Sequence, residues 1–161
     1  MKPLDQQQIR TAMANSTRGE ASRMVFPAGF GGLDFTVLEY LGWRDPKAPQ
    51  RGYLVSWQDG RPVGIALRAP EGASKKSVMC TLCRTTHSSG GVALFAAPRA
   101  GSAGRNGNTV GTYICADLAC STYIRQPKPT LAVVPEPGLD VEQRIAGLLT
   151  RTAAFVDRVL N

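Results

Sequence analysis

Apolar and polar residues alternate most clearly over residues 52–57 and 62–68. Such alternation is typical of half-buried strands, and the Asp-Gly pair between the two runs is a strong hairpin-turn signal. An aromatic and β-branched run at residues 33–41 predicts an earlier strand. Two prolines lie within residues 44–51, which predicts irregular structure there. The first half of the chain therefore predicts a small antiparallel sheet.

Residues 5–25 show a broken helical pattern. Asp5 is a suitable N-cap for a first helix, because its carboxylate can accept hydrogen bonds from the first turn. Ser16 or Thr17 then predicts the cap of a short second helix, with Glu20 as the acid of a capping box.

The most regular helical pattern covers residues 139–160. Its apolar or small side chains recur at helical spacing, at Val141, Ile145, Leu148, Leu149, Thr152, Phe155, Val156 and Val159. Such a stripe predicts a face that packs on the core, and a partner-binding face is the alternative. Four prolines within residues 126–138 predict an extended connector before this helix.

The middle of the chain predicts a second hairpin, with strands at residues 92–97 and 109–114. Residues 98–108 between them predict a flexible, basic, Gly-rich loop. A short helix is expected over residues 118–124. Strands and helices in this order predict an α+β fold, a small antiparallel sheet domain with helices.

The 161-residue chain carries 19 Lys and Arg against 12 Asp and Glu, a formal charge of +7. Arg forms two-point contacts with phosphate or carboxylate, so we expect an anionic partner such as RNA, a ribosomal surface or an acidic protein. A merely well-solvated surface is the alternative. No apolar run is long enough to span a membrane, and the N-terminal sequence becomes polar at once. We therefore expect a cytoplasmic protein without membrane partners.

Four cysteines form the strongest chemical signal. The pattern is Cys80-x2-Cys83, then 31 residues, then Cys115-x4-Cys120. Two closely spaced thiolate pairs are suitable ligands for tetrahedral zinc. The predicted order of elements, which is a knuckle, a hairpin and then a strand leading into a helix, is that of a treble-clef finger. Disulfides and buried free thiols are the alternatives. His87 could replace one of the cysteines as a ligand, but we expect it to be an exposed loop residue.

With four cysteines as ligands, the zinc has no open coordination position, so one structural Zn²⁺ is expected. The chain contains one histidine and no metalloprotease or nucleophile-elbow motif. The glycines at 101, 104 and 107 lack the Lys-Ser/Thr of a phosphate-binding loop. We therefore expect no enzyme and no small-molecule substrate.

Several segments resemble the FBP domain, the C-terminal treble-clef region of FusB-type elongation factor G-binding proteins. The resemblance rests on residues 16–21, 41–46, 51–55, 79–83 and 111–120. It implies a zinc-stabilised lobe that binds elongation factor G and promotes its release from the ribosome, which protects translation from fusidic acid. An RNA-binding module that contacts rRNA through its basic loops is the alternative function. Fibronectin binding, suggested by the historical family name, is discounted.

These observations divide the chain into four parts. The parts are N-terminal helices with the β-hairpin (1–75), a treble-clef zinc lobe (76–125), a Pro-rich connector (126–138) and a C-terminal helix (139–161). Arg and Tyr are the residue types that most often carry interface energy. The residues expected to contact the partner are Arg99, Arg105, Tyr113, Tyr123 and Arg125. The alternative is that Tyr113 packs within the hairpin and the arginines are only solvated.

Overall fold

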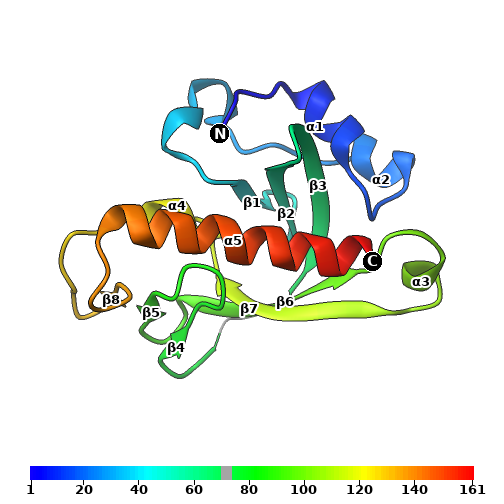
Figure 1. The fold of residues 1–161 in the computed structure, drawn as a ribbon. Helices are drawn as coiled ribbons and strands as arrows, with labels where there is room; N and C mark the ends of the chain where they lie inside the picture. The colour runs from blue at the N-terminus through cyan, green and yellow to red at the C-terminus, as the bar shows by residue number, and fades with distance from the viewer. Residues whose placement is uncertain (70–73) are drawn as a thin grey trace.

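A five-stranded antiparallel sheet forms the centre of the computed structural model, which describes residues 1–69 and 74–161 (Figure 1). Its strand order is β1-β2-β3-β6-β7. The strands are β1 (Leu41–Asp45), β2 (Ala48–Gln58), β3 (Arg61–Arg68), β6 (Val92–Pro98) and β7 (Thr109–Cys115). The predicted α+β class is confirmed, and both predicted hairpins, β2–β3 and β6–β7, are present.

The turn between β2 and β3 shows why the first hairpin is so clear in the sequence. Asp59 and Gly60 adopt φ angles of 47° and 79°, the left-handed pair that matches the twist of a two-residue hairpin. The irregular structure predicted for 44–51 is wrong, since β1 extends to Asp45 and β2 begins at Ala48. Proline is tolerated in the first residues of a strand, where few ladder hydrogen bonds are lost.

Three helices begin with an acidic or hydroxyl cap, and the sequence predicts the first two of these caps. They are α1 (Gln6–Ala12), α2 (Arg18–Ser22) and α5 (Val141–Leu160). Each has a complete capping box, formed by Asp5 with Gln8, Thr17 with Glu20, and Asp140 with Gln143. The reciprocal hydrogen bonds satisfy amide groups that the first turn leaves without partners.

The strand predicted for residues 33–41 is mostly wrong. Two short 3-10 helices, η1 (Phe30–Gly32) and η2 (Phe35–Val37), precede β1 instead. The Asp34 side chain accepts a hydrogen bond from the Thr36 N–H at 2.9 Å, a local turn that competes with strand formation.

Two other segments are more regular than predicted. The Gly-rich loop at 98–108 contains a short helix, α3 (Gly101–Arg105), and the Pro-rich connector contains β8 (Val133–Val134). A side chain at Gly104 would lie 1.8 Å from the Arg99 carbonyl oxygen, so this turn needs glycine. β8 joins β4 (Val78–Met79) and β5 (Thr86–His87) in a small second sheet.

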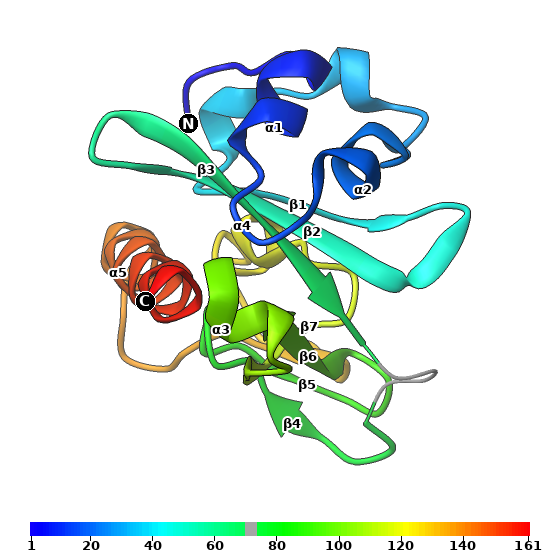
Figure 2. The same cartoon turned by 90° about the vertical axis from the view of Figure 1, so that its right-hand side faces the viewer.

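Alternate residues of β2 face two different cores. Leu54 belongs to the zinc-side core, whose members include Tyr40, Leu67, Phe95, Phe155 and the four cysteines. Tyr53 and Val55 belong to the aromatic core, with Leu4, Ile9, Met24, Phe30, Phe35, Leu41 and Trp43. Figures 1 and 2 show α5 lying on one side of the sheet and the N-terminal helices on the other. The predicted core face of α5 is confirmed at Leu148, Thr152, Phe155, Val156 and Val159.

The sheet continues across the expected boundary between residues 75 and 76. β3 pairs with β6 through Arg68 and Ala96. The Asn15 side chain strengthens this junction, because its amide donates to the Ala66 and Pro98 carbonyl oxygens at 3.1 and 2.8 Å. Within residues 1–69 and 74–161, no helix is long and apolar enough to cross a membrane.

Candidate metal centre

The first cysteine pair lies in the tight turn between β4 and β5. The Cys80 carbonyl oxygen accepts a hydrogen bond from the Arg84 N–H at 2.9 Å, and the Cys83 N–H donates to the Cys80 sulfur at 3.4 Å. Arg84 has a φ angle of 59°, which reverses the chain immediately after the pair. The turn therefore points both sulfur atoms to the same side.

The second pair lies where β7 leads into helix α4 (Cys120–Tyr123). Cys115 ends the strand and Cys120 begins the helix. Leu118 has a φ angle of 63° and donates its N–H to the Cys115 carbonyl oxygen at 2.8 Å. Asp117 accepts from the Ala119 N–H at 3.0 Å. The unusual four-residue spacer thus forms a compact turn that brings both sulfur atoms inward.

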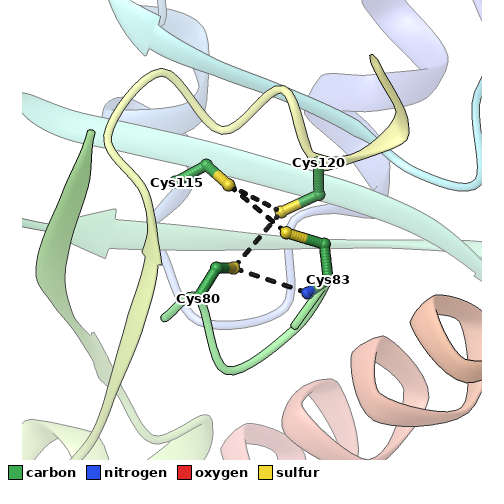
Figure 3. Close-up of side chains that lie close together, drawn as sticks. All are labelled: Cys80, Cys83, Cys115 and Cys120. Atoms are coloured by element: carbon green, nitrogen blue, oxygen red, sulfur yellow. Dashed lines mark hydrogen bonds between the residues drawn. The ribbon is translucent and has the colours of Figure 1, made fainter. Parts of the chain in front are cut away.

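Figure 3 shows the four cysteine side chains converging on one point. Their sulfur atoms all lie within 4.8 Å of one another, and the closest pairs, Cys83–Cys115, Cys115–Cys120 and Cys80–Cys120, are 3.5, 3.5 and 3.6 Å apart. A disulfide would need about 2.0 Å. Four sulfurs each about 2.3 Å from a zinc ion, at the corners of a tetrahedron, lie about 3.8 Å apart. The cysteines are free, buried and spaced for zinc.

The electrostatics of the cluster explain why a cation belongs there. The neighbouring thiols raise the pKa of Cys115, and burial raises that of Cys120. Hydrogen bonds from Cys115, Cys120 and Cys80 lower the pKa of Cys83. Four buried thiolates therefore cannot coexist without a compensating charge. One structural Zn²⁺ held by the four sulfurs provides this charge and fixes two turns that are distant in sequence.

His87 is not the exposed loop residue that the sequence predicts. It lies in β5, is 3% exposed, and its Nε2 atom is 3.3 Å from the Cys115 sulfur. Its ring packs edge-on against Tyr123, with centroids 4.5 Å apart. A side chain at Gly91 would lie 2.4 Å from the His87 Cβ. His87 is thus a buried neighbour that hydrogen-bonds to a ligand sulfur.

Two of the expected partner residues also brace the metal centre. Arg125 forms a two-point ion pair with Glu39, both contacts at 2.7 Å, and also donates to the Ser121 carbonyl oxygen. The Tyr123 hydroxyl donates to Asp117 at 2.7 Å, and burial raises the pKa of Tyr123. Their role in partner binding stays a prediction, with a structural role now beside it.

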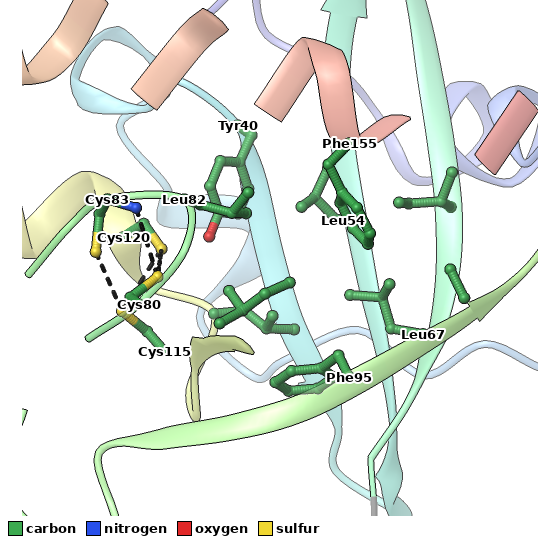
Figure 4. Close-up of a cluster of buried hydrophobic side chains, with 14 of the residues drawn as sticks. Tyr40, Leu54, Leu67, Cys80, Leu82, Cys83, Phe95, Cys115, Cys120 and Phe155 are labelled. Atoms are coloured by element: carbon green, nitrogen blue, oxygen red, sulfur yellow. Dashed lines mark hydrogen bonds between the residues drawn. The ribbon is translucent and has the colours of Figure 1, made fainter. Parts of the chain in front are cut away.

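Nothing local in the sequence marks Glu39 as important. Its carboxylate is 5% exposed, and its N–H donates to the Ser121 hydroxyl at 3.0 Å. Tyr40 follows it, and its hydroxyl points toward the cysteines (Figure 4). Burial and the nearby Cys120 raise the pKa of Tyr40. The segment before β1 is therefore attached directly to the metal centre.

Of the other three expected partner residues, Tyr113 lies near the metal centre and the two arginines lie away from it. Tyr113 is 45% exposed and lies opposite Leu94 on the paired strands β6 and β7. Arg99 precedes α3 and Arg105 ends it, at the far end of the same hairpin. From Cys115 to Thr109 the strand rises about 20 Å. Arg99 and Arg105 therefore lie at the opposite end of the hairpin from the metal centre, which Tyr113, Tyr123 and Arg125 adjoin.

A knuckle, a β-hairpin and a strand leading into a helix, joined by four cysteines, define a treble-clef zinc finger. The chain belongs to the FBP C-terminal treble-clef zinc-finger family, whose pattern matches residues 8–159. Its fold is similar to that of the fusidic acid resistance protein FusC, with a TM-score of 0.56 and 20% identity. The similarity covers 75% of this chain and 52% of FusC, so the chain spans about half of FusC. No curated protein sequence matches it.

Proposed function

We propose that this protein binds elongation factor G in the cytoplasm and modulates its release from the ribosome, without catalysing a reaction. The family supports this proposal, because the resemblance noted in the sequence is to proteins that bind this factor. The similarity to a fusidic acid resistance protein agrees with it. Four cysteine ligands leave zinc no open position for a substrate, which favours a structural metal.

The observation that carries the proposal is an exposed apolar pair beside the zinc. Leu94 and Tyr113 are directly opposite each other on β6 and β7, and they are 44% and 45% exposed. The Tyr113 carbonyl oxygen accepts from the Thr81 N–H at 2.8 Å, inside the first zinc turn. Met79, two residues earlier, is 44% exposed. Exposed large apolar side chains on a rigid strand are suitable anchors for a protein partner.

Zinc supports this surface through its ligands. Cys115 ends the strand that carries Tyr113, and Cys80 follows the strand that carries Met79. Fixing both sulfurs to one ion fixes the two strands relative to each other, so the anchors are positioned before the partner arrives. Such preorganisation reduces the entropy lost on binding.

The proposal is tested by titrating purified elongation factor G with the zinc-loaded protein and with Leu94→Ala/Tyr113→Ala. Central anchors contribute about 2 kcal/mol or more, so we expect binding at least about 30-fold weaker. A matched control is Val37→Ala/Leu149→Ala, which removes two other exposed apolar side chains, 46% and 48% exposed. It should bind as the unaltered protein does.

Zinc content and circular dichroism of each variant show that the fold is intact. Equal affinity for both double variants would place the interface elsewhere. Absence of binding by the unaltered protein, with and without ribosomes, would disprove the proposal.

A further inference from the structure

A basic groove lies between helices α2 and α3, far from the Leu94–Tyr113 pair. It has a volume of about 720 Å³, and the side chains that matter here are Asn15, Glu20, Arg68, Arg99 and Arg105. A smaller hollow continues from it and adds Arg51. Figure 2 shows both helices on the side that faces the viewer.

The groove has a fixed floor. Asn15 lines it, and its side chain is held on both sides, accepting from the Ala66 N–H at 2.7 Å and donating to the Ala66 and Pro98 carbonyl oxygens. These bonds join β3 and β6 where the two strands diverge beyond their single paired position. The backbone of β3 and β6 and the Asn15 side chain at the base of the groove are therefore held together by hydrogen bonds.

The groove carries an excess of positive charge. In the part of the chain that the structure describes, the guanidinium groups of Arg68, Arg99 and Arg105 have no hydrogen-bond or ion-pair partner. Among the described residues that line the groove, Glu20 is the acidic one. Its carboxylate already accepts hydrogen bonds from the Thr17 N–H and hydroxyl at 2.8 and 2.9 Å. Three arginines without hydrogen-bonded partners thus line the groove, although the charge of Glu20 also attracts Arg68.

We propose that this groove binds a single strand of nucleic acid through its phosphates. Arginine pairs with phosphate in two-point geometry, and a phosphodiester strand offers repeated charges along an open groove. Among the described residues that line the larger hollow, none is aromatic or a large aliphatic. A peptide would find no anchor pocket there, and bases would find no stacking platform. Binding is consequently independent of sequence.

The probe is a fluorescein-labelled single-stranded RNA of about 12 nucleotides, a length within the range of small single-strand sites. Fluorescence anisotropy is measured at several salt concentrations. With three phosphate contacts, the logarithm of the RNA association constant should fall with the logarithm of the salt concentration with a slope of about −2. A DNA strand of the same sequence should bind about equally, since no 2′-hydroxyl contact is involved.

Arg99→Ala/Arg105→Ala removes two of the three contacts. Each contributes about 0.7 to the slope, so we expect a slope of about −0.7 and binding about 25-fold weaker at about 0.1 M salt. Lys47→Ala/Arg61→Ala is the control, because it removes the same charge from two exposed turns outside the groove. It should bind nearly normally. Glu20→Gln, which removes the opposing charge, should bind more tightly.

An equal loss of RNA affinity in Arg99→Ala/Arg105→Ala and Lys47→Ala/Arg61→Ala would show only a general charge effect and overturn the proposal. So would a polyglutamate peptide that binds more tightly than the RNA, because the groove would then serve an acidic protein segment. The titration with elongation factor G separates the two proposals. If the sequence-based expectation that Arg99 and Arg105 contact the factor is wrong and they serve the groove alone, Arg99→Ala/Arg105→Ala should still bind the factor. Leu94→Ala/Tyr113→Ala should still bind the RNA.

Discussion

The two cores on either side of β2 are held together in different ways. The aromatic core contains four large rings, Phe30, Phe35, Trp43 and Tyr53, and residues from the first 55 positions. Phe26 packs on its edge and stacks on Trp43 at a centroid distance of 5.2 Å. The zinc-side core draws on segments from Tyr40 to Val159 and includes the four cysteines. One core depends on large local side chains, and the other on distant segments tied by a metal.

This difference follows from how much apolar surface each region can bury. A large ring buries about 150–250 Å², so a few aromatic residues suffice for the N-terminal core. Around the metal, the turns at Cys80–Cys83 and Cys115–Cys120 contribute Leu82 and Leu118 as their large apolar side chains. Metal binding then supplies stability that burial alone does not. Removing zinc should therefore affect the two cores unequally.

The largest expected effect comes from Cys83→Ser, which removes one zinc ligand. Structural zinc contributes about 10–16 kcal/mol in zinc-finger peptides near neutral pH, which is comparable with the total stability of a typical domain. We expect loss of zinc and of the ordered turns around it, whereas the aromatic core and the β2–β3 hairpin stay largely formed. Elemental analysis reports the metal. Trp43 and Trp57 both lie on the N-terminal side, so their fluorescence reports the aromatic core.

Thr81→Ala, an exposed change in the same turn, is the control and should keep its zinc. Chelation of the unaltered protein should reproduce the cysteine variant, with all four thiols becoming reactive. Tryptophan fluorescence that collapses in step with zinc loss would mean that the two cores are one cooperative unit.

The sequence predicts the metal centre and the local hairpins well, because both depend on short-range signals. The cysteine spacing is a chemical constraint, and Asp59-Gly60 and the capping boxes act within a few residues. The pairing of β3 with β6 has no such signal. It joins Arg68 to Ala96, and only packing of the whole chain decides that non-local contact.

The burial of His87 and Glu39 could not be predicted from the sequence for the same reason. His87 looks like a loop residue because polar Thr and Ser residues flank it, yet Gly91 and Tyr123 enclose its ring. Glu39 looks like an ordinary surface acid, and it is buried because Arg125, distant in the sequence, pairs with it. The sequence predicts that Arg125 contacts a partner, and its pair with Glu39 shows that a charge count cannot separate solvated arginines from those in internal ion pairs.

A smaller effect is expected from Trp43→Ala, which tests the aromatic core directly. The indole N–H donates to the Val25 carbonyl oxygen at 3.0 Å, and the ring contacts Phe26 and Tyr53. Truncating a buried aromatic costs about 3–5 kcal/mol. We expect the free energy of unfolding to fall by this amount in chemical denaturation, with zinc still bound. Trp57→Ala, at a less buried indole that donates to the Lys2 carbonyl oxygen, should cost less.

If Trp43→Ala instead releases zinc under native conditions, the aromatic core supports the metal centre, and the comparison between the two cores has to be reversed. Thiol reactivity decides this, because the four cysteines are all in the zinc site.

The smallest expected effect is at the cap of α2, on the aromatic side of the sheet. Thr17→Ala removes the hydroxyl that accepts from the Glu20 N–H at 3.1 Å, and loss of an N-cap costs about 1 kcal/mol.

Hydrogen bonds from Thr17 lower the pKa of Glu20 below its ordinary value of 4.5. A lowered folded-state pKa stabilises the protein above the unfolded value, and this contribution is lost as the pH falls through the folded value. The free energy of unfolding of Glu20→Gln and of the unaltered protein is therefore measured at pH 7 and near pH 3. We expect the variant to be less stable only at pH 7. The zinc content at pH 7 should be the same in both proteins. A difference between the two proteins that persists at low pH would show that the Glu20 contribution does not come from its charge.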